Sequence, residues 1–199
     1  MFVTIDRRLG DIMDIAILNW LQNFTHPILD TFFMYFTRLG DHGELWIAIC
    51  LIFMAKRKTR RAGFLGLIAL LIEAVLVAVV LKPLFDRPRP YVTHDFPILI
   101  PSPSGSSFPS GHTASSFAVA FVLYFNRVPL RKTIIVLAGL MSYSRLYLYV
   151  HYPSDVLFGV FTALAIAILL KIYPDRIILA TKRSYYFFRD HFRAKKEKF

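Results

Sequence analysis

The stretch GFLGLIALLIEAVLVAVVLKPLF occupies residues 63–85, and Glu73 and Lys82 are its only charged side chains. A helix needs about 20 mainly apolar residues to cross a hydrocarbon layer about 30 Å thick. Residues 63–85 are therefore long and apolar enough to cross as one helix. The stretch predicts an integral membrane protein. Within it, Glu73 is expected either to make a hydrogen bond inside a helical bundle or to lie near a substrate path.

Shorter apolar stretches accompany this segment, and we expect four further membrane helices at residues 43–55, 113–125, 133–149 and 156–173. The first of these has 13 residues, so it must borrow neighbouring residues or cross a thinned bilayer. The predicted fold class is an all-α, polytopic membrane helical bundle with five core transmembrane helices. A sixth span is expected only if the N-terminal region also crosses.

The N-terminal region predicts a different kind of helix. Residues 11–38 alternate apolar and polar side chains at roughly helical spacing, with a break at Pro27. This pattern is typical of amphipathic helices, which we expect over 11–23 and 27–38, lying at the membrane interface. A first short span is the alternative. Charged residues close to the start interrupt any apolar run there, so no cleaved signal peptide is expected.

Composition limits the number of domains and the kinds of site. The chain has 199 residues, of which 56% are hydrophobic, and its mean hydropathy is +0.50. This length allows one integral-membrane domain over 1–199. The single Cys50 leaves no disulfide or cysteine metal site within the chain. The formal charge of +11 does not predict a nucleic-acid partner, because no known nucleic-acid-binding fold accompanies it.

Basic residues beside the expected helices predict the orientation of the chain. Seventeen of the 24 Lys and Arg side chains lie in loop 56–62, in loop 126–132, or from Lys171 onward. If five spans alternate, these segments share one side, which the positive-inside rule assigns to the cytoplasm. The basic tail, 174–199, would then be cytoplasmic. Its interleaved aromatic and basic residues suit either an anionic lipid surface or simple anchoring.

Three polar stretches at the other ends of these helices contain the candidate site residues. These stretches are Lys82–Pro90, Pro109–His112 and Ser144–Asp155. The predicted topology brings all three to the extracytoplasmic face. Lys82, Arg89 and Arg145 can supply positive charge to the oxygens of a tetrahedral phosphate. The planar guanidinium can do so with two parallel hydrogen bonds.

The motif Pro109-Ser110-Gly111-His112 opens the helix that we expect over 113–125. The first turn of a helix has free backbone N–H groups and the positive end of the helix dipole, so it readily binds anions. Ser110 is a candidate cap, and Gly111 lets a phosphate approach the backbone. His112 would then lie beside the bound anion.

His151 and Asp155 lie on either side of the start of the last expected helix. A carboxylate that binds one imidazole nitrogen fixes the tautomer and makes the other nitrogen a better nucleophile. The two histidines, His112 and His151, can therefore move a proton and attack phosphorus. Together with the cations they have the chemistry needed to break a phosphate ester.

The chain contains the three motifs Lys82-x6-Arg89-Pro90, Pro109-Ser110-Gly111-His112 and Ser144-Arg145-x5-His151-x3-Asp155. Together they resemble the motifs of the type 2 phosphatidic acid phosphatase superfamily. That family shares its site with vanadium haloperoxidases and bacterial acid phosphatases. The resemblance covers residues 82–155 and implies a phosphohistidine on His151, oriented by Asp155. It implies that His112 is the acid and then the base. It also implies, without any metal ion or cofactor, a phosphate cage made of Lys82, Arg89, Arg145, Ser110 and Gly111.

The resemblance implies a multi-pass lipid phosphatase of the plasma or inner membrane. Undecaprenyl diphosphate is the favoured substrate, because the chain is compact and the expected site faces outward, and its hydrolysis would serve cell-wall biogenesis. Phosphatidylglycerol phosphate and phosphatidic acid are the alternatives. A vanadate-dependent haloperoxidase and a non-catalytic protein that binds lipids or anions are less favoured.

Two further interpretations concern the loops. Loop 91–108 carries the apolar patch Ile98–Ile100, which we expect to dip into the membrane interface and to shape the path of the lipid. Arg87 and Arg89 alternate with Pro88 and Pro90 in a stiff, extended segment, and either arginine could bind phosphate oxygens or lipid headgroups.

Overall fold

The computed structural model describes residues 2–179, and the regular structure in this range is entirely helical. The elements are α1 (Phe2–Gln22), α2 (Pro27–Arg38), α3 (Glu44–Ala55), α4 (Arg60–Val75), the π-helical η1 (Leu76–Leu81), α5 (Lys82–Phe85), α6 (Pro90–Thr93), α7 (Gly111–Phe125), α8 (Arg131–Tyr147) and α9 (Pro153–Ile172). The all-α prediction is confirmed. The part of the predicted basic tail beyond residue 179 lies outside the described residues.

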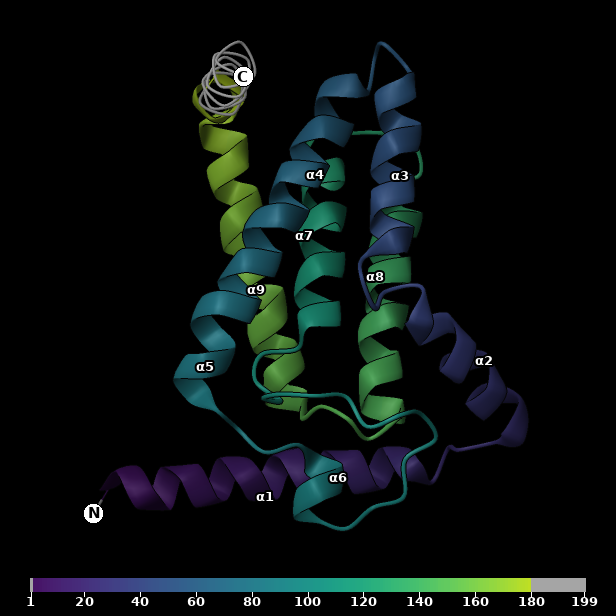
Figure 1. The fold of residues 1–199 in the computed structure, drawn as a ribbon, viewed down its shortest axis with the longest axis vertical. Coiled ribbons are helices and arrows are strands. Elements are labelled where there is room, and N and C mark those ends of the chain that lie inside the picture. The colour runs from purple at the N-terminus through teal and green to yellow at the C-terminus, as the bar shows by residue number, and fades with distance from the viewer. Residues whose placement is uncertain (1, 180–199) are drawn as a thin grey trace, which may run out of the picture.

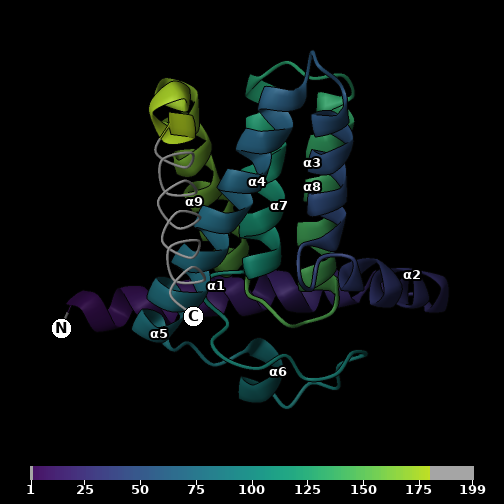
Figure 2. The same ribbon diagram turned by 45° about the horizontal axis from the view of Figure 1, so that its top comes forward.

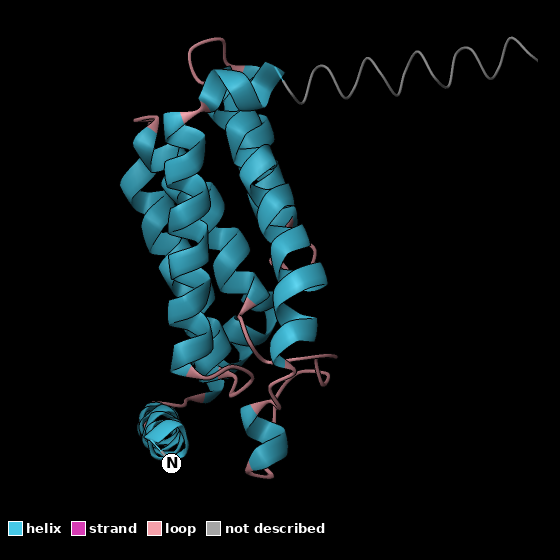
Figure 3. Ribbon diagram, turned by 90° about the vertical axis from the view of Figure 1, so that its left-hand side faces the viewer, coloured by secondary structure: helices cyan, strands magenta, loops and turns pink. Residues whose placement is uncertain are grey.

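The helices form a bundle with two helices attached to one of its ends. Figure 1 shows α3, α4, α7, α8 and α9 running side by side, with α1 lying crosswise beneath them and α2 leaning against the bundle. The same arrangement is visible after a turn of 45° (Figure 2). In the view turned by 90°, α1 is seen nearly end-on below the bundle (Figure 3). Helix α1 thus lies across the end of the bundle and not along its axis.

Helix α7 lies at the centre of the bundle and contacts α4, α8 and α9. Small residues on the facing helices allow this close packing. At Gly159 of α9, an added Cβ would lie 3.0 Å from the carbonyl oxygen of Ser110 and 3.3 Å from the backbone nitrogen of Ala114. Because Gly159 has no side chain, α9 can approach the first turn of α7. This contact brings the two motifs at the starts of α7 and α9 together.

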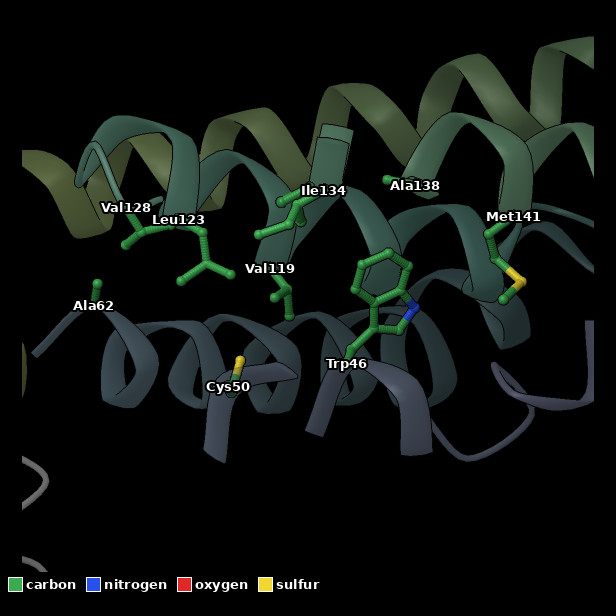
Figure 4. Close-up of a cluster of buried hydrophobic side chains, with 10 residues drawn as sticks. Trp46, Cys50, Ala62, Val119, Leu123, Val128, Ile134, Ala138 and Met141 are labelled. Atoms are coloured by element: carbon green, nitrogen blue, oxygen red, sulfur yellow. The ribbon is translucent and has the colours of Figure 1, made fainter. Parts of the chain in front are cut away.

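The apolar core fills the space between α3, α7 and α8. Figure 4 shows the buried side chains of Trp46 and Cys50 facing Val119, Ile134 and Met141 across this space. Cys50 is a free, fully buried thiol. The outward faces are also apolar, since Leu157 on α9 and Val79 on η1 are 70% and 67% exposed. Exposed apolar surface of this kind is expected where a bundle contacts lipid.

The stretch that opened the sequence analysis forms a continuous helical segment from α4 through η1 to α5. The backbone N–H of Lys82 donates to the carbonyl of Val77, five residues back, so the helix widens into a π-turn just before Pro83. Two helical segments of the described chain, residues 60–93 and Pro153–Ile172, are long and apolar enough to cross a membrane by themselves. The helices α3 and α7 are apolar but shorter.

One local prediction was wrong. Helix α1 begins at Phe2 and not near residue 11, because charged side chains that end an apolar pattern do not end a helix. The apolar patch in loop 91–108 packs partly inside the protein, and its place at the membrane interface stays a prediction. Ile98 and Ile100 pack against the buried cluster of Phe33, Tyr147 and Leu148, and Leu99 is 44% exposed.

Candidate active site

Six of the eight predicted site residues line one cavity of about 710 Å³. They are Lys82, Arg89, Gly111, His112, Arg145 and His151. The cavity lies between the loop after α2, the α4–η1–α5 segment, loop residues 100–104, and the adjoining ends of α7 and α8. Asp155 and Ser110 are fully buried behind its wall.

Two arginines of this cavity are almost completely buried. Arg89 is 4% exposed, and its guanidinium donates to the carbonyl oxygens of Val150 at 3.0 Å and Gly105 at 3.1 Å. Burial lowers the pKa of Arg89 from its ordinary value. Arg145 is 2% exposed, and its Nη1 donates to Thr37 Oγ1. The Nε of Arg145 has no hydrogen-bond partner among the described residues. Cations buried beside a shared cavity favour an anion within it.

The ring of His151 lies between a cation and a carboxylate. Its Nε2 is 3.2 Å from Arg89 Nη1, and its Nδ1 is 3.4 Å from Asp155 Oδ2. Because a guanidinium can only donate, Nε2 must be the unprotonated nitrogen, and the proton belongs on Nδ1, which faces Asp155. Burial lowers the pKa of His151 to about 3, so the ring is neutral at physiological pH. The unprotonated Nε2 thus lies beside the guanidinium of Arg89, on a residue that lines the cavity.

Asp155 occupies the third position of α9 and is held by several donors. Its Oδ2 accepts from the backbone N–H of Tyr152 at 2.8 Å and from Ser107 Oγ, and its Oδ1 accepts from Arg87 Nη1 at 2.8 Å. The carbonyl oxygen of Asp155 also accepts from the backbone N–H of Ser110 at 3.2 Å. These donors therefore hold the carboxylate in place beside His151.

Sequence reasoning treated Arg87 as part of a stiff segment that could bind phosphate or lipid headgroups, and it missed the contact of Arg87 with Asp155. The guanidinium of Arg87 lies 3.8 Å from the centre of the Tyr152 ring and bridges Asp155 to Asp14 of α1, which it reaches at 2.9 Å. These two carboxylates raise the pKa of Arg87 although burial alone would lower it. Asp14 also accepts from the backbone N–H of Ser154 at 3.0 Å. Helix α1 is thereby linked through two ion pairs to Asp155, which lies beside His151.

We expect Asp14→Asn to lower kcat/KM about tenfold, because supporting residues around a catalytic group are typically worth about 10- to 100-fold. The neutral amide would hold Arg87 less firmly, and Asp155 would lose part of its orientation. Steady-state phosphate release measures the effect. Asp86→Asn, at an exposed loop position, is the matched control. Full activity of Asp14→Asn would contradict this role of α1.

The ring of His112 is held by the end of α2 and by the loop that follows it. Its Nε2 is 3.2 Å from both the carbonyl oxygen of Thr37 and Asp41 Oδ1. Sequence reasoning did not identify Thr37 or Asp41, because they lie about 70 residues from His112, at the end of a helix expected only to rest on the membrane and just beyond it. No local pattern marks this contact.

The residues of the motif at the start of α7 have different contacts. The side chain of Ser110 caps the helix, accepting from the backbone N–H of Thr113 at 3.5 Å and from Thr113 Oγ1 at 3.0 Å. Gly111 lines the cavity. Contact of Ser110 with phosphate stays a prediction. The hydrogen bond expected of Glu73 inside the bundle is confirmed, since its Oε1 accepts from Thr162 Oγ1 at 2.5 Å. The residue also lines the cavity, and a position near a substrate path stays a prediction.

Comparisons with known proteins show the family to which this chain belongs. The family model described as "PAP2 superfamily" matches residues 62–178. The undecaprenyl-diphosphatase BcrC of Bacillus subtilis is 25% identical over 169 residues, which cover 82% of this chain and 85% of that protein.

Two solved structures share the fold. The crystal structure of LpxE from Aquifex aeolicus superposes with a TM-score of 0.71 at 31% identity, covering 80% of this chain and 94% of that one. A transmembrane PAP2-type phosphatidylglycerolphosphate phosphatase from Bacillus subtilis superposes with a TM-score of 0.66 at 28% identity, covering 84% and 87%. The chain belongs to the PAP2 superfamily and is a membrane lipid phosphatase, a hydrolase that acts on lipid phosphates.

Proposed function

We propose that this protein hydrolyses a lipid diphosphate, with undecaprenyl diphosphate as the favoured substrate, through a phosphohistidine on His151. The observation that carries the proposal is the position of His151 Nε2, an unprotonated nitrogen on the wall of a cavity that Lys82, Arg89 and Arg145 also line. Phosphoryl transfer depends mainly on positioning and on stabilising charge at the equatorial oxygens. The cavity has side chains that can position the phosphate and cations that can stabilise its charge.

In the first step, the lone pair of His151 Nε2 attacks phosphorus while the bond from phosphorus to the leaving oxygen breaks. His112 gives its proton to that oxygen. Asp155 faces Nδ1 and stabilises the positive charge that develops on the ring. The three cations and the N–H groups at the start of α7 bind the equatorial oxygens.

In the second step, His112 takes a proton from a water molecule, and the water oxygen attacks the phosphohistidine. The bond between nitrogen and phosphorus breaks, His151 returns to its neutral form, and inorganic phosphate leaves. His112 ends the cycle protonated. All these steps use side chains of this chain.

Two observations support the choice of lipid: the similarity of the chain to known phosphatases and the volume of the cavity. The similarity to the undecaprenyl-diphosphatase extends over 82% of the chain, which supports the polyprenyl diphosphate. The likeness to the phosphatidylglycerolphosphate phosphatase supports phosphatidylglycerol phosphate as the second candidate, with phosphatidic acid as a related monoester. A cavity of about 710 Å³ exceeds the needs of one phosphate group and accommodates a larger headgroup.

We further propose one membrane domain over 1–199 with five spans, α1 and α2 at the interface, and the active site on the extracytoplasmic face. The basic loops 56–62 and 126–132 lie at the end of the bundle opposite α1 (Figure 1). Arg61 pairs with Asp175 at 2.7 Å at that end, so the start of the C-terminal segment lies there too. The positive-inside rule assigns this end to the cytoplasm.

A side-by-side assay tests the substrate. Purified protein in detergent, with EDTA present, is given undecaprenyl diphosphate, phosphatidylglycerol phosphate and phosphatidic acid, and kcat/KM is measured from phosphate release. We expect all three to be hydrolysed, with the highest kcat/KM for the diphosphate. A higher value for either phosphomonoester would contradict the favoured substrate. Absence of phosphate release from all three would contradict the proposed function.

A further inference from the structure

The contacts of His112 decide which of its ring nitrogens carries a fixed proton. Its Nε2 lies 3.2 Å from the Thr37 carbonyl oxygen and 3.2 Å from Asp41 Oδ1. A carbonyl and an ionised carboxylate can only accept hydrogen bonds. Nε2 must therefore be protonated, and Nδ1 is the nitrogen left to exchange a proton with a substrate.

The loop that makes these contacts is built close against the ring. An added Cβ at Gly40 would lie 2.9 Å from Cδ2 of His112, next to Nε2, and 3.1 Å from the end of Met141. Only a residue without a side chain lets the loop approach so closely. Thr37 is 2% exposed and also accepts from Arg145 Nη1 through its hydroxyl. The end of α2 thus holds two of the residues that line the cavity.

The charges around His112 make a carboxylate at this position important. Burial and the nearby charge of Arg145 on α8 both oppose a positive charge on the imidazole, and Lys82 and Arg89 line the same cavity. Asp41 counters them from the loop, where His42 is a further neighbour. The hydrogen bond with His112 lowers the pKa of Asp41, so the carboxylate is ionised at neutral pH.

We propose that Asp41 is a positioning residue for the acid–base role of His112, a role that is itself part of the proposed function. Asp41 holds the tautomer with the proton on Nε2 and stabilises the imidazolium form. The bond between Nδ1 and its proton then breaks as the proton passes to the leaving oxygen, and neutral Nδ1 later takes a proton from water. The site thus contains two carboxylate–imidazole pairs with separate tasks, Asp155 with the nucleophile and Asp41 with the acid.

The leaving group provides the test, because a general acid matters most when the leaving oxygen is strongly basic. kcat/KM is measured for Asp41→Asn with a lipid alkyl monophosphate and with p-nitrophenyl phosphate, whose leaving oxygen needs little protonation. We expect a loss of about 10- to 100-fold with the alkyl ester and a clearly smaller loss with the aryl ester. The ratio of the two values does not depend on how much enzyme is folded.

The pH profile gives a second readout. His112 must be protonated in the first step, so kcat/KM for the alkyl ester falls as pH rises. Without the carboxylate the imidazolium form is less stable, and this alkaline limb should move to lower pH by about one unit. Asp41→Glu keeps the charge and should restore part of the activity, and Asp95→Asn, in an exposed loop, should match the wild type.

Equal losses on both esters with an unmoved alkaline limb would overturn the proposal, since a merely structural role predicts that result. Wild-type values on both esters would overturn it as well. His112→Asn separates this failure from failure of the proposed function. If His112→Asn shows the selective loss on the alkyl ester but Asp41→Asn does not, only the role of Asp41 is wrong. If neither variant shows it, the acid role of His112 is wrong too.

Discussion

Replacing His151 with Gln is expected to lower phosphate release from lipid substrates by at least about 10⁴-fold, as removal of a nucleophile does in other enzymes. The Gln side chain is close in size and can still accept a hydrogen bond from Arg89, so the buried contact at 3.2 Å has a replacement. What it lacks is a nucleophilic nitrogen. Release of inorganic phosphate from purified protein in detergent measures the loss.

The thermal unfolding midpoint in the same detergent is the control, and it should stay close to that of the wild type. A His151→Gln protein that is folded and retains more than about one-tenth of the activity would contradict the nucleophilic role, because the remaining groups supply binding and charge only. His94→Gln, at an exposed loop position, should leave the activity unchanged.

Arg145→Lys is expected to lower kcat about 10²- to 10³-fold, which corresponds to about 3–4 kcal/mol of lost transition-state stabilisation. The side chain is 2% exposed, and one of its donors is already committed to Thr37 while Nε has no partner among the described residues. A lysine keeps the charge but has no second, rigidly placed donor to bind two phosphate oxygens at once. The loss should therefore appear mainly in kcat.

Arg61→Lys is the matched control, because Arg61 is exposed, pairs with Asp175 and lies at the far end of the bundle. It should behave as the wild type. Activity of Arg145→Lys within about twofold of the wild type would show that charge alone suffices and that the guanidinium fork has no part in catalysis.

The motif residues could be predicted because their chemistry is encoded in residue type and short spacing. His151 and Asp155 are four residues apart across a helix start, and Ser110 precedes α7 as a cap should. The stretch 63–85 could be predicted as one helix from its length and hydropathy. These inferences need no knowledge of what lies on neighbouring helices.

The partners of these residues could not be predicted, because tertiary packing alone brings them near. Asp14 lies in a region whose amphipathic pattern explains its charges without any contact to the site, and Asp41 lies in the short loop that follows this region. The packing of the loop patch at Ile98–Ile100 could not be predicted for the same reason. Its apolar side chains are as suitable for a membrane interface as for the pocket beside Phe33 that they occupy. Hydropathy does not distinguish the two environments.

The most direct test of the account is to locate the phosphorus on the enzyme. His112→Asn, given p-nitrophenyl phosphate, should form the phosphoenzyme but hydrolyse it slowly, because the base for water is missing. Mass spectrometry after alkaline quenching identifies the residue, and ³¹P NMR distinguishes the two ring nitrogens. The account predicts phosphorus on His151 Nε2. Phosphorus on Nδ1 or on another residue, or transfer to water with no covalent intermediate, would contradict it.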